Sequence, residues 1–180
     1  DVNIEIGVIT KKELDLILKK LKKDKAPGPD KAITELFKWL DEESREHLLG
    51  ILNLCWSHEY MPDATLEANV ASIFKKGDTK QLENYRPISL LTTFYKIIAS
   101  VIQVRLAKGL DHLIQPTQFG FRARKSTAQA LYLARRAQDL AEQSGIHLNL
   151  ALLDWEKAFD KVFYSSVTDA LKDVCVEPDV

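Results

Sequence analysis

The sequence is poor in the residues that mark several common protein classes. It has two cysteines, Cys55 and Cys175, which lie far apart without the spacing of metal ligands. We therefore expect a reducing compartment and neither a disulfide framework nor a zinc site. No apolar run approaches the ~20 residues that span a bilayer, and no signal peptide precedes Asp1, so we expect no membrane partner. Because the chain lacks an initiator Met, we expect it to be a piece of a longer protein.

The chain also has almost no net charge, -1 at pH 7, which argues against a protein that binds nucleic acid by electrostatics alone. The charges are nevertheless uneven. Residues 11–25 carry seven Lys against three acids, residues 96–126 carry six cations against Asp111, and residues 154–180 carry seven acids against three Lys. Basic segments suit a phosphate backbone and acidic clusters attract divalent metal, although solvated helix faces of mixed charge would give the same distribution.

What is present is a succession of helices and short strands, with a hydrophobic content of 46% that is ordinary for a soluble protein. Thr10 and Glu13 form a capping-box pattern that begins a helix, and the Pro-Gly-Pro sequence within residues 25–30 ends it. A second helical stretch is expected over residues 33–60, with a break near Asp41. These patterns predict a helical N-terminal third.

A hairpin is expected next, from strands at residues 69–74 and 85–91 joined by a long polar loop. A helix over residues 93–113 follows, and a second capping box begins another helix that ends at Ser144-Gly145. That box pairs Ser126 with Gln129, and a last helix is expected to start near Ser165. The order of helices, hairpin, helices and strand predicts an α+β fold.

The most informative segment is the apolar run at residues 146–153, which ends on Asp154. A continuous apolar run predicts a strand buried on both faces, and Asp154 would then stand at the edge of the sheet where it could bind a metal ion. An acid that closes a strand often caps the next helix instead, so this segment alone leaves both roles open.

Three other segments could carry chemistry: residues 75–78, 84–90 and 118–122. Each has an ordinary explanation when taken alone. The first is a good turn, Arg86 could form a surface ion pair worth under about 1 kcal/mol, and Phe119 and Phe121 could belong to the core. Their order along the chain is what gives them weight.

Together, these segments resemble the reverse transcriptases of non-LTR (LINE-type) retrotransposons over nearly the whole chain. Five blocks carry the resemblance. They are Lys25-Ala-Pro-Gly-Pro-Asp30, Ile73-Phe-Lys-Lys-Gly-Asp78, Glu83-Asn-Tyr-Arg-Pro-Ile-Ser-Leu-Leu91, Gln118-Phe-Gly-Phe-Arg122 with Ser126-Thr127, and Asp154 with Lys157-Ala-Phe-Asp160.

The resemblance implies a right-hand polymerase of which this chain would hold the fingers and the start of the palm. Residues 1–62 would form a helical extension of the fingers, residues 63–145 the fingers hairpin and helices, and residues 146–180 the start of the palm with the first catalytic Asp motif. The implied activity is RNA-directed DNA polymerisation in the nucleus or cytoplasm. Its partners would be an RNA template, a DNA primer or target, dNTPs and the remaining palm and thumb of the polymerase.

The same resemblance assigns roles in two-metal nucleotidyl transfer, which uses two Mg²⁺ ions or Mn²⁺ in their place. Asp154 would be the catalytic metal ligand, joined by the backbone carbonyl of Trp155. On the fingers, Lys75, Lys76 and Arg86 would bind the dNTP triphosphate; which of the two lysines makes the contact stays open, with Lys75 favoured.

Further residues receive roles in substrate selection and template binding. Phe159 would be the steric gate that excludes a ribose 2′-hydroxyl, the alternative being a core Phe beneath the sheet. Asp160 would be structural or an ion-pair partner. Template or primer binding is expected from residues of the fourth block and the loop after it: Gln118, Arg122, Arg124 and Lys125.

The sequence also departs from the family pattern. The second palm motif, an aromatic-x-Asp-Asp turn, is absent, so we expect no polymerase activity from this chain alone. Lys31 stands where the family usually has Gly, and Phe163-Tyr164 stand where a polar pair is common. Two alternatives remain: a degenerate element copy that serves as an RNA-binding or interaction module, and a group II intron maturase.

Overall fold

The computed structural model describes residues 2, 4–155, 158–159 and 161–175. Within this part of the chain, helices are combined with one antiparallel pair of strands, which confirms the mixed α and β composition predicted from the sequence. No helix in the described ranges has both the length and the apolar character that crossing a membrane requires.

The chain divides into two compact units, residues 5–106 and residues 107–180 with 1–4. The first contains α1 (Lys11–Lys20), α2 (Thr34–Lys38), α3 (Glu42–Ser57), α4 (Asp63–Leu66), β1 (Ala68–Phe74), η1 (Leu82–Asn84), β2 (Tyr85–Leu91) and most of α5 (Thr93–Leu110). The second contains α6 (Thr127–Ser144) and α7 (Tyr164–Cys175). The predicted division at residues 62 and 145 stays a prediction.

Helix α1 begins as its sequence predicts. The backbone N–H of Glu13 donates to Thr10 Oγ1 at 3.3 Å, and the Glu13 carboxylate accepts from the Thr10 N–H at 2.9 Å, which completes the capping box. Its apolar face buries Leu14, Ile17 and Leu18. The predicted helix and its start are therefore confirmed.

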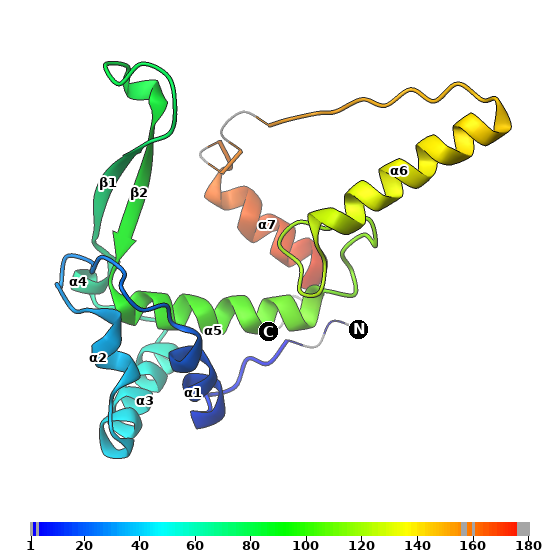
Figure 1. Cartoon of the computed structure of the whole chain (residues 1–180). Coiled ribbons are helices and arrows are strands. Elements are labelled where there is room, and N and C mark those ends of the chain that lie inside the picture. Colours follow the sequence, from blue (N-terminus) through cyan, green and yellow to red (C-terminus); the bar gives the residue numbers. More distant parts are fainter. Residues whose placement is uncertain (1, 3, 156–157, 160, 176–180) are drawn as a thin grey trace. The chain divides into compact units, whose positions relative to one another are not determined.

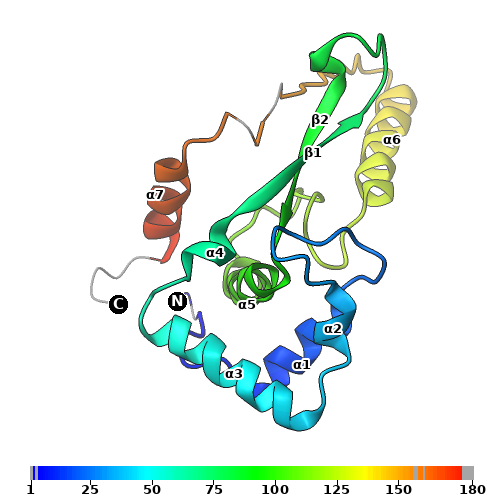
Figure 2. The same ribbon diagram turned by 90° about the vertical axis from the view of Figure 1, so that its left-hand side faces the viewer.

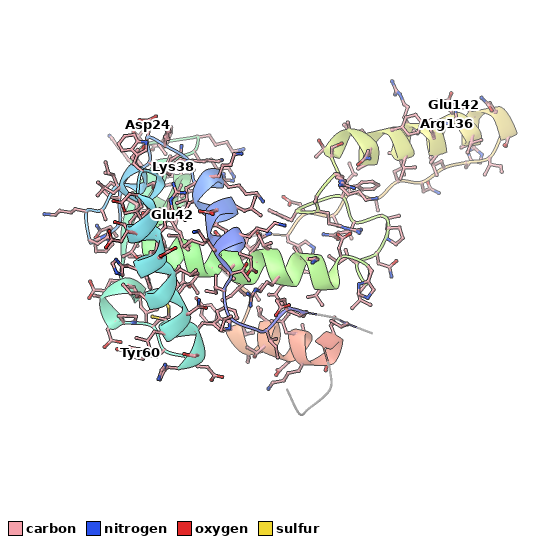
Figure 3. The ribbon with its side chains drawn as sticks, turned by 90° about the horizontal axis from the view of Figure 1, so that it is seen from below. Asp24, Lys38, Glu42, Tyr60, Arg136 and Glu142 are labelled. Atoms are coloured by element: carbon pink, nitrogen blue, oxygen red, sulfur yellow. The ribbon has the colours of Figure 1, made fainter. Side chains whose placement is uncertain are left out.

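A lysine from the next helix closes the other end of α1. Lys38 Nζ donates to the carbonyls of Leu18, Lys19 and Leu21 at 3.1, 2.9 and 2.7 Å, and Figure 3 shows Lys38 on α2 beside α1. The last carbonyls of a helix have no partner within it, and a cation there also suits the negative end of the helix dipole. Lys38 therefore fixes α2 against α1.

The predicted break near Asp41 separates α2 from α3. Asp41 is the N-cap of α3, and its carboxylate accepts a hydrogen bond from the Ser44 N–H at 2.9 Å. Helix α3 buries Leu48, Leu52 and Cys55, the last as a free thiol. These side chains complete one face of the hydrophobic core.

Helix α5 supplies the opposite face of that core with Ile97, Ile98 and Val101. Figure 2 looks along α5 and shows α1, α2 and α3 to one side of it. The ten buried hydrophobic residues of the described chain all belong to residues 5–106: Ile9, Leu14, Ile17, Leu18, Leu48, Leu52, Cys55, Ile97, Ile98 and Val101.

A buried arginine ties the N-terminal segment to this core. Arg105 on α5 is 5% exposed and donates to both carboxylate oxygens of Glu13, at 2.8 and 3.0 Å. It also donates to the carbonyls of Glu5, Gly7 and Val8. Because the guanidinium binds this carboxylate directly, it lowers the pKa of Glu13 from 4.5 to about 2. These contacts attach residues 5–8 and the start of α1 to α5.

The predicted hairpin is confirmed as β1 and β2, which pair antiparallel from Ala68↔Leu91 to Phe74↔Tyr85. It extends away from helices α1 to α4 (Figure 1). The rings of Phe74 and Tyr85, opposite each other in this register, make an edge-to-face contact with centroids 5.4 Å apart. The hairpin therefore carries its tip loop, residues 75–84, away from helices α1 to α4.

The loop of residues 25–31 packs against the base of this hairpin. Gly28 is buried, and a Cβ placed on it would lie 2.7 Å from both the Leu91 carbonyl carbon and the Thr92 nitrogen. Lys31 in the same loop has a φ of 55°, the left-handed region that favours glycine. The Gly that the resemblance leads one to expect at this position thus has a backbone reason, and Lys31 carries strain in its place.

The second unit contains the predicted helices but not the predicted strand. Helix α6 begins after Ser126, whose N–H donates to the Gln129 side chain at 2.9 Å, and it ends at Gly145 with a left-handed φ of 65°. Residues 146–153 belong to no strand, and Leu152 and Leu153 are 97% and 90% exposed. The prediction of a strand buried on both faces is wrong, because no second strand among the described residues pairs with this run.

Candidate functional site

The hairpin presents four cationic side chains around its tip: Lys75, Lys76, Lys80 and Arg86. All four are exposed, and none makes a hydrogen bond or ion pair with any other described residue. The register places Arg86 opposite Ile73, and the Lys75 N–H donates to the Asn84 carbonyl at 2.8 Å, which continues the ladder one pair further. Because side chains alternate along a strand, Lys75 falls on the face of Arg86, whereas Lys76 lies beyond the ladder, in the turn.

The tip loop is ordered by contacts that the sequence did not indicate. Asn84 Nδ2 donates to the Asp78 carbonyl at 2.8 Å, and the Tyr85 hydroxyl donates to the Thr79 carbonyl at 3.0 Å. Gly77 has a φ of 95°, and a Cβ there would lie 2.7 Å from Asn84 Nδ2. Asn84 and Tyr85 stand inside a block singled out above, but only the structure shows what their side chains hold.

In the second unit, the loop between α5 and α6 is built around Arg122. Its guanidinium donates to Asp111 Oδ1 at 2.9 Å and to the carbonyls of Asp111, Ile114 and Gln115. The Arg122 side chain is 10% exposed. This ion pair lowers the pKa of Asp111 and raises that of Arg122. Arg122 therefore braces the loop, a contact that nothing near Asp111 in the sequence indicated.

The other three residues predicted to bind nucleic acid lie on the same loop with fewer contacts. Lys125 Nζ lies 5.5 Å from the centre of the Phe119 ring and 3.5 Å from the Pro116 carbonyl. The Gln118 side chain donates one long hydrogen bond, of 3.4 Å, to the Gly120 carbonyl within the loop. Arg124 is exposed and makes no polar contact with another described residue. Arg124 and Lys125 directly precede the N-terminus of α6, where free backbone N–H groups favour anions.

Asp154 is exposed and makes no polar contact with another described residue. Trp155 beside it is 83% exposed. No group of three or more His, Cys, Asp or Glu side chains in the described part of the chain is arranged to hold a metal ion. The metal-binding role of Asp154 therefore stays a prediction.

Phe159 lies against a residue of another predicted block. Its ring meets that of Phe121 edge to face, with centroids 6.0 Å apart and an angle of 89° between the planes. Phe159 is 82% exposed, so among the described residues it is not a core side chain. The second unit thus brings the block at residues 118–122 next to the residue predicted to be the steric gate. Lys157 and Asp160, which belong to the same block as Phe159, lie outside the described residues.

Comparison with known proteins points to one family. The family model "Reverse transcriptase (RNA-dependent DNA polymerase)" matches residues 73–178, a stretch that runs from β1 past α7. This single match therefore includes the cationic tip of the hairpin with β2, the loop braced by Arg122, and Asp154.

Curated relatives align with nearly all of the chain. An uncharacterised 149 kDa protein of transposon TX1 from Xenopus laevis is 30% identical over 164 residues, 91% of this chain. The RNA-directed DNA polymerase from mobile element jockey of Drosophila melanogaster is 30% identical over 166 residues, again 91% of this chain. A probable RNA-directed DNA polymerase from transposon BS of the same fly is 26% identical over 98% of this chain. The chain spans 12%, 18% and 20% of these three proteins.

Proposed function

The chain belongs to the reverse transcriptase family, and we propose from this premise that it forms the fingers and the first palm motif of a right-hand polymerase that copies RNA into DNA. The observation that carries the proposal is the hairpin, which holds exposed, unpaired cations at the start of a family match that continues through Asp154. The relatives are mobile-element proteins, in agreement with the predicted resemblance to LINE-type enzymes rather than with a maturase.

The hairpin cations bind the triphosphate of the incoming nucleotide. Arg86 suits this role because its planar fork donates two hydrogen bonds to a phosphate group, and Lys75 on the same face adds a point charge. Neither side chain has a competing partner among the described residues, so no existing contact is lost on binding. Lys76, in the turn beyond the ladder, contributes to the electrostatic potential around the tip.

Asp154 contributes one ligand to the catalytic metal. Mg²⁺ is usually held by one or two carboxylates together with substrate phosphates and water, so a single exposed carboxylate with the Trp155 carbonyl fits one side of such an ion. When bound, Mg²⁺ stabilises the charge on the attacking and leaving oxygens of nucleotidyl transfer. The further ligands of a two-metal site would come from the substrate and from the rest of the polymerase.

Phe159 selects deoxynucleotides by occupying the space of a ribose 2′-hydroxyl. Its exposure leaves the ring free to meet a sugar, and its contact with Phe121 limits where the ring can move. The loop that begins at Arg122 receives the template or primer backbone through Arg124 and Lys125, with Gln118 nearby. Arg122 supports these residues by holding the loop in place.

The apolar run at residues 146–153 packs against the rest of the polymerase. Leu150, Leu152 and Leu153 are all more than half exposed, and neighbouring exposed apolar side chains mark a surface that another part of a protein covers. The partners of the active polymerase are an RNA template, a DNA primer and dNTPs.

The test is primer extension on an RNA template by the protein expressed from the complete open reading frame. Asp154→Ala should reduce extension by at least about 100-fold, since the reaction depends on charge neutralisation at the metal. Asp173→Ala, an exposed carboxylate on α7, serves as the matched control. Near-normal extension by Asp154→Ala would remove Asp154 from the active site. Template binding without any extension by the unaltered protein would favour an RNA-binding module instead.

A further inference from the structure

The tip of the hairpin combines free cations with a backbone that is held in place. The cations Lys75, Lys76, Lys80 and Arg86 have no partner among the described residues. The backbone beneath them, in contrast, is held by several hydrogen bonds across the loop, including one from the Lys80 N–H to Asp78 Oδ1 at 2.9 Å. A loop whose backbone is already ordered can bind an anion through its free cations without the entropy cost of ordering on binding.

Two side chains account for most of the ordering. Asn84 Nδ2 reaches across the loop to the Asp78 carbonyl, which also accepts the Gln81 N–H at 3.2 Å. The space that Asn84 occupies exists because residue 77 has no Cβ. The amide thus closes the turn that directly follows Lys75 and Lys76.

The Tyr85 hydroxyl holds the other part of the loop. It donates to the Thr79 carbonyl at 3.0 Å, while the ring lies edge-on against Phe74 at the end of β1. Tyr85 precedes Arg86 in β2, so one side chain links the strand that carries the arginine to the loop that carries the lysines. Loss of the hydroxyl would free Thr79 while leaving the ring contact intact.

We propose that Asn84 and Tyr85 are positioning residues for triphosphate binding, because they fix the spacing between Lys75 and Arg86. This inference rests on the proposed function of the hairpin and assigns it a support that neither the sequence nor the relatives indicate. Neither side chain needs to touch the nucleotide. A loosened loop would still carry the same charge, but its cations would have to be ordered at the moment of binding.

The experiment titrates inorganic tripolyphosphate into the ¹⁵N-labelled 180-residue chain at low ionic strength. The shifts of the Lys75 and Arg86 amides report binding at the tip, and amides of α3 and α5 report whether the core is unchanged. Tyr85→Phe should weaken binding about 3-fold and Asn84→Ala somewhat more, since each loses one hydrogen bond. Tyr132→Phe is the matched control, because the exposed Tyr132 hydroxyl bonds to no described residue.

A double-mutant comparison separates positioning from direct contact. In the Lys75→Ala/Arg86→Ala background, Tyr85→Phe should have no further effect on the residual affinity for tripolyphosphate, because the two cations that Tyr85 positions are absent. A 3-fold loss that persists in this background would overturn the inference in favour of a direct contact by the hydroxyl. Exchange of the Lys75 amide with solvent should also be faster in Tyr85→Phe.

The outcomes distinguish this inference from the proposed function. Wild-type affinity in both Tyr85→Phe and Asn84→Ala, with weakened binding in Arg86→Ala, would overturn the inference and leave the triphosphate site intact. Wild-type affinity in Arg86→Ala and Lys75→Ala would overturn the triphosphate site itself. Since Tyr85→Phe keeps the ring packed on Phe74, it remains informative even if Asn84→Ala opens the loop.

Discussion

The two compact units of this chain treat their apolar side chains in opposite ways. Residues 5–106 contain every buried hydrophobic side chain of the described protein, whereas Leu152 and Leu153 in the other unit are almost fully exposed. Both regions have clear apolar patterns in sequence. The difference teaches that an apolar pattern in the sequence shows which side chains favour burial. Whether they are buried depends on other segments that pack against them.

The two regions also use arginine differently. Arg105 is buried and pairs with a carboxylate 92 residues away in the chain, while Arg122 braces a loop through an aspartate 11 residues away. Arg86, by contrast, has no partner among the described residues. The chain thus uses its engaged arginines to hold structure and leaves the hairpin arginine free for a ligand.

The largest expected effect compares the same substitution in the two units. Leu52 is 0% exposed and Leu152 is 97% exposed. Leu52→Ala should lower the free energy of unfolding by about 4 kcal/mol because it leaves a cavity in the core, and Leu152→Ala should change it by less than about 0.5 kcal/mol. Urea unfolding followed by circular dichroism measures both. Equal effects would show that residues 146–153 are buried after all.

The next largest effect is expected for Arg105, which attaches residues 5–8 and the start of α1 to α5. Arg105→Ala should destabilise this unit by about 3 kcal/mol, since it leaves Glu13 and three carbonyls without their donor. Arg136→Ala is the control, because Arg136 on α6 is exposed and pairs with Asp139 three residues on. That surface pair should contribute less than about 0.5 kcal/mol to unfolding. A small effect of Arg105→Ala in urea unfolding would mean that packing alone holds residues 5–8.

The same ion pair predicts that the stability of the first unit depends on pH. Glu13 has its pKa lowered from 4.5 to about 2 by Arg105, so the unfolded chain binds more protons in that interval. Stability from this group is complete above pH 4.5 and is lost as the pH falls towards 2, by about 2 kcal/mol once its partial exposure is allowed for. Urea midpoints between pH 5 and 2.5 measure the loss. Glu13→Gln should flatten the profile, and an unchanged slope would assign the loss to other carboxylates.

The smallest effect is a gain. Lys31 has a φ of 55°, a conformation that glycine adopts without the clash of a Cβ. Lys31→Gly should therefore stabilise the first unit by about 0.5–1 kcal/mol in spite of the greater freedom of glycine in the unfolded chain. Lys25→Gly, in the same loop without a positive φ, should give no such gain. If both variants lose stability in urea unfolding, the left-handed conformation is not maintained in solution.

Most of the secondary structure could be predicted because its signals are local. The capping pairs Thr10 with Glu13 and Ser126 with Gln129 each lie within one helical turn, and both begin helices in the structure. The hairpin strands lie close together in sequence and pair with each other. The run at residues 146–153 failed because a strand needs a neighbour, and the sequence of the run does not contain one.

The residues of the candidate site also differ in how far the sequence could predict their roles and contacts. The sequence drew attention to Lys75 and Arg86, and the register adds that they fall on one face of the hairpin. The sequence did not show that Arg122 forms an ion pair with Asp111, because an ion pair across a folded loop leaves no periodic signal in the sequence. Asp154 was expected at the edge of a sheet that the described residues do not form, and its metal-binding role stays a prediction.

The close packing of Gly28 has a consequence for the reach of the hairpin. Seven residues of strand separate its base from its tip, roughly 23 Å at 3.3 Å per residue. A methyl group at residue 28 would press on the backbone at Leu91 and Thr92, where the hairpin leaves the helices. A tilt of about 5° there would move the tip by about 2 Å, more than a hydrogen bond tolerates. The position of the cations proposed to bind the triphosphate thus depends partly on Gly28, a residue without a side chain at the other end of the hairpin.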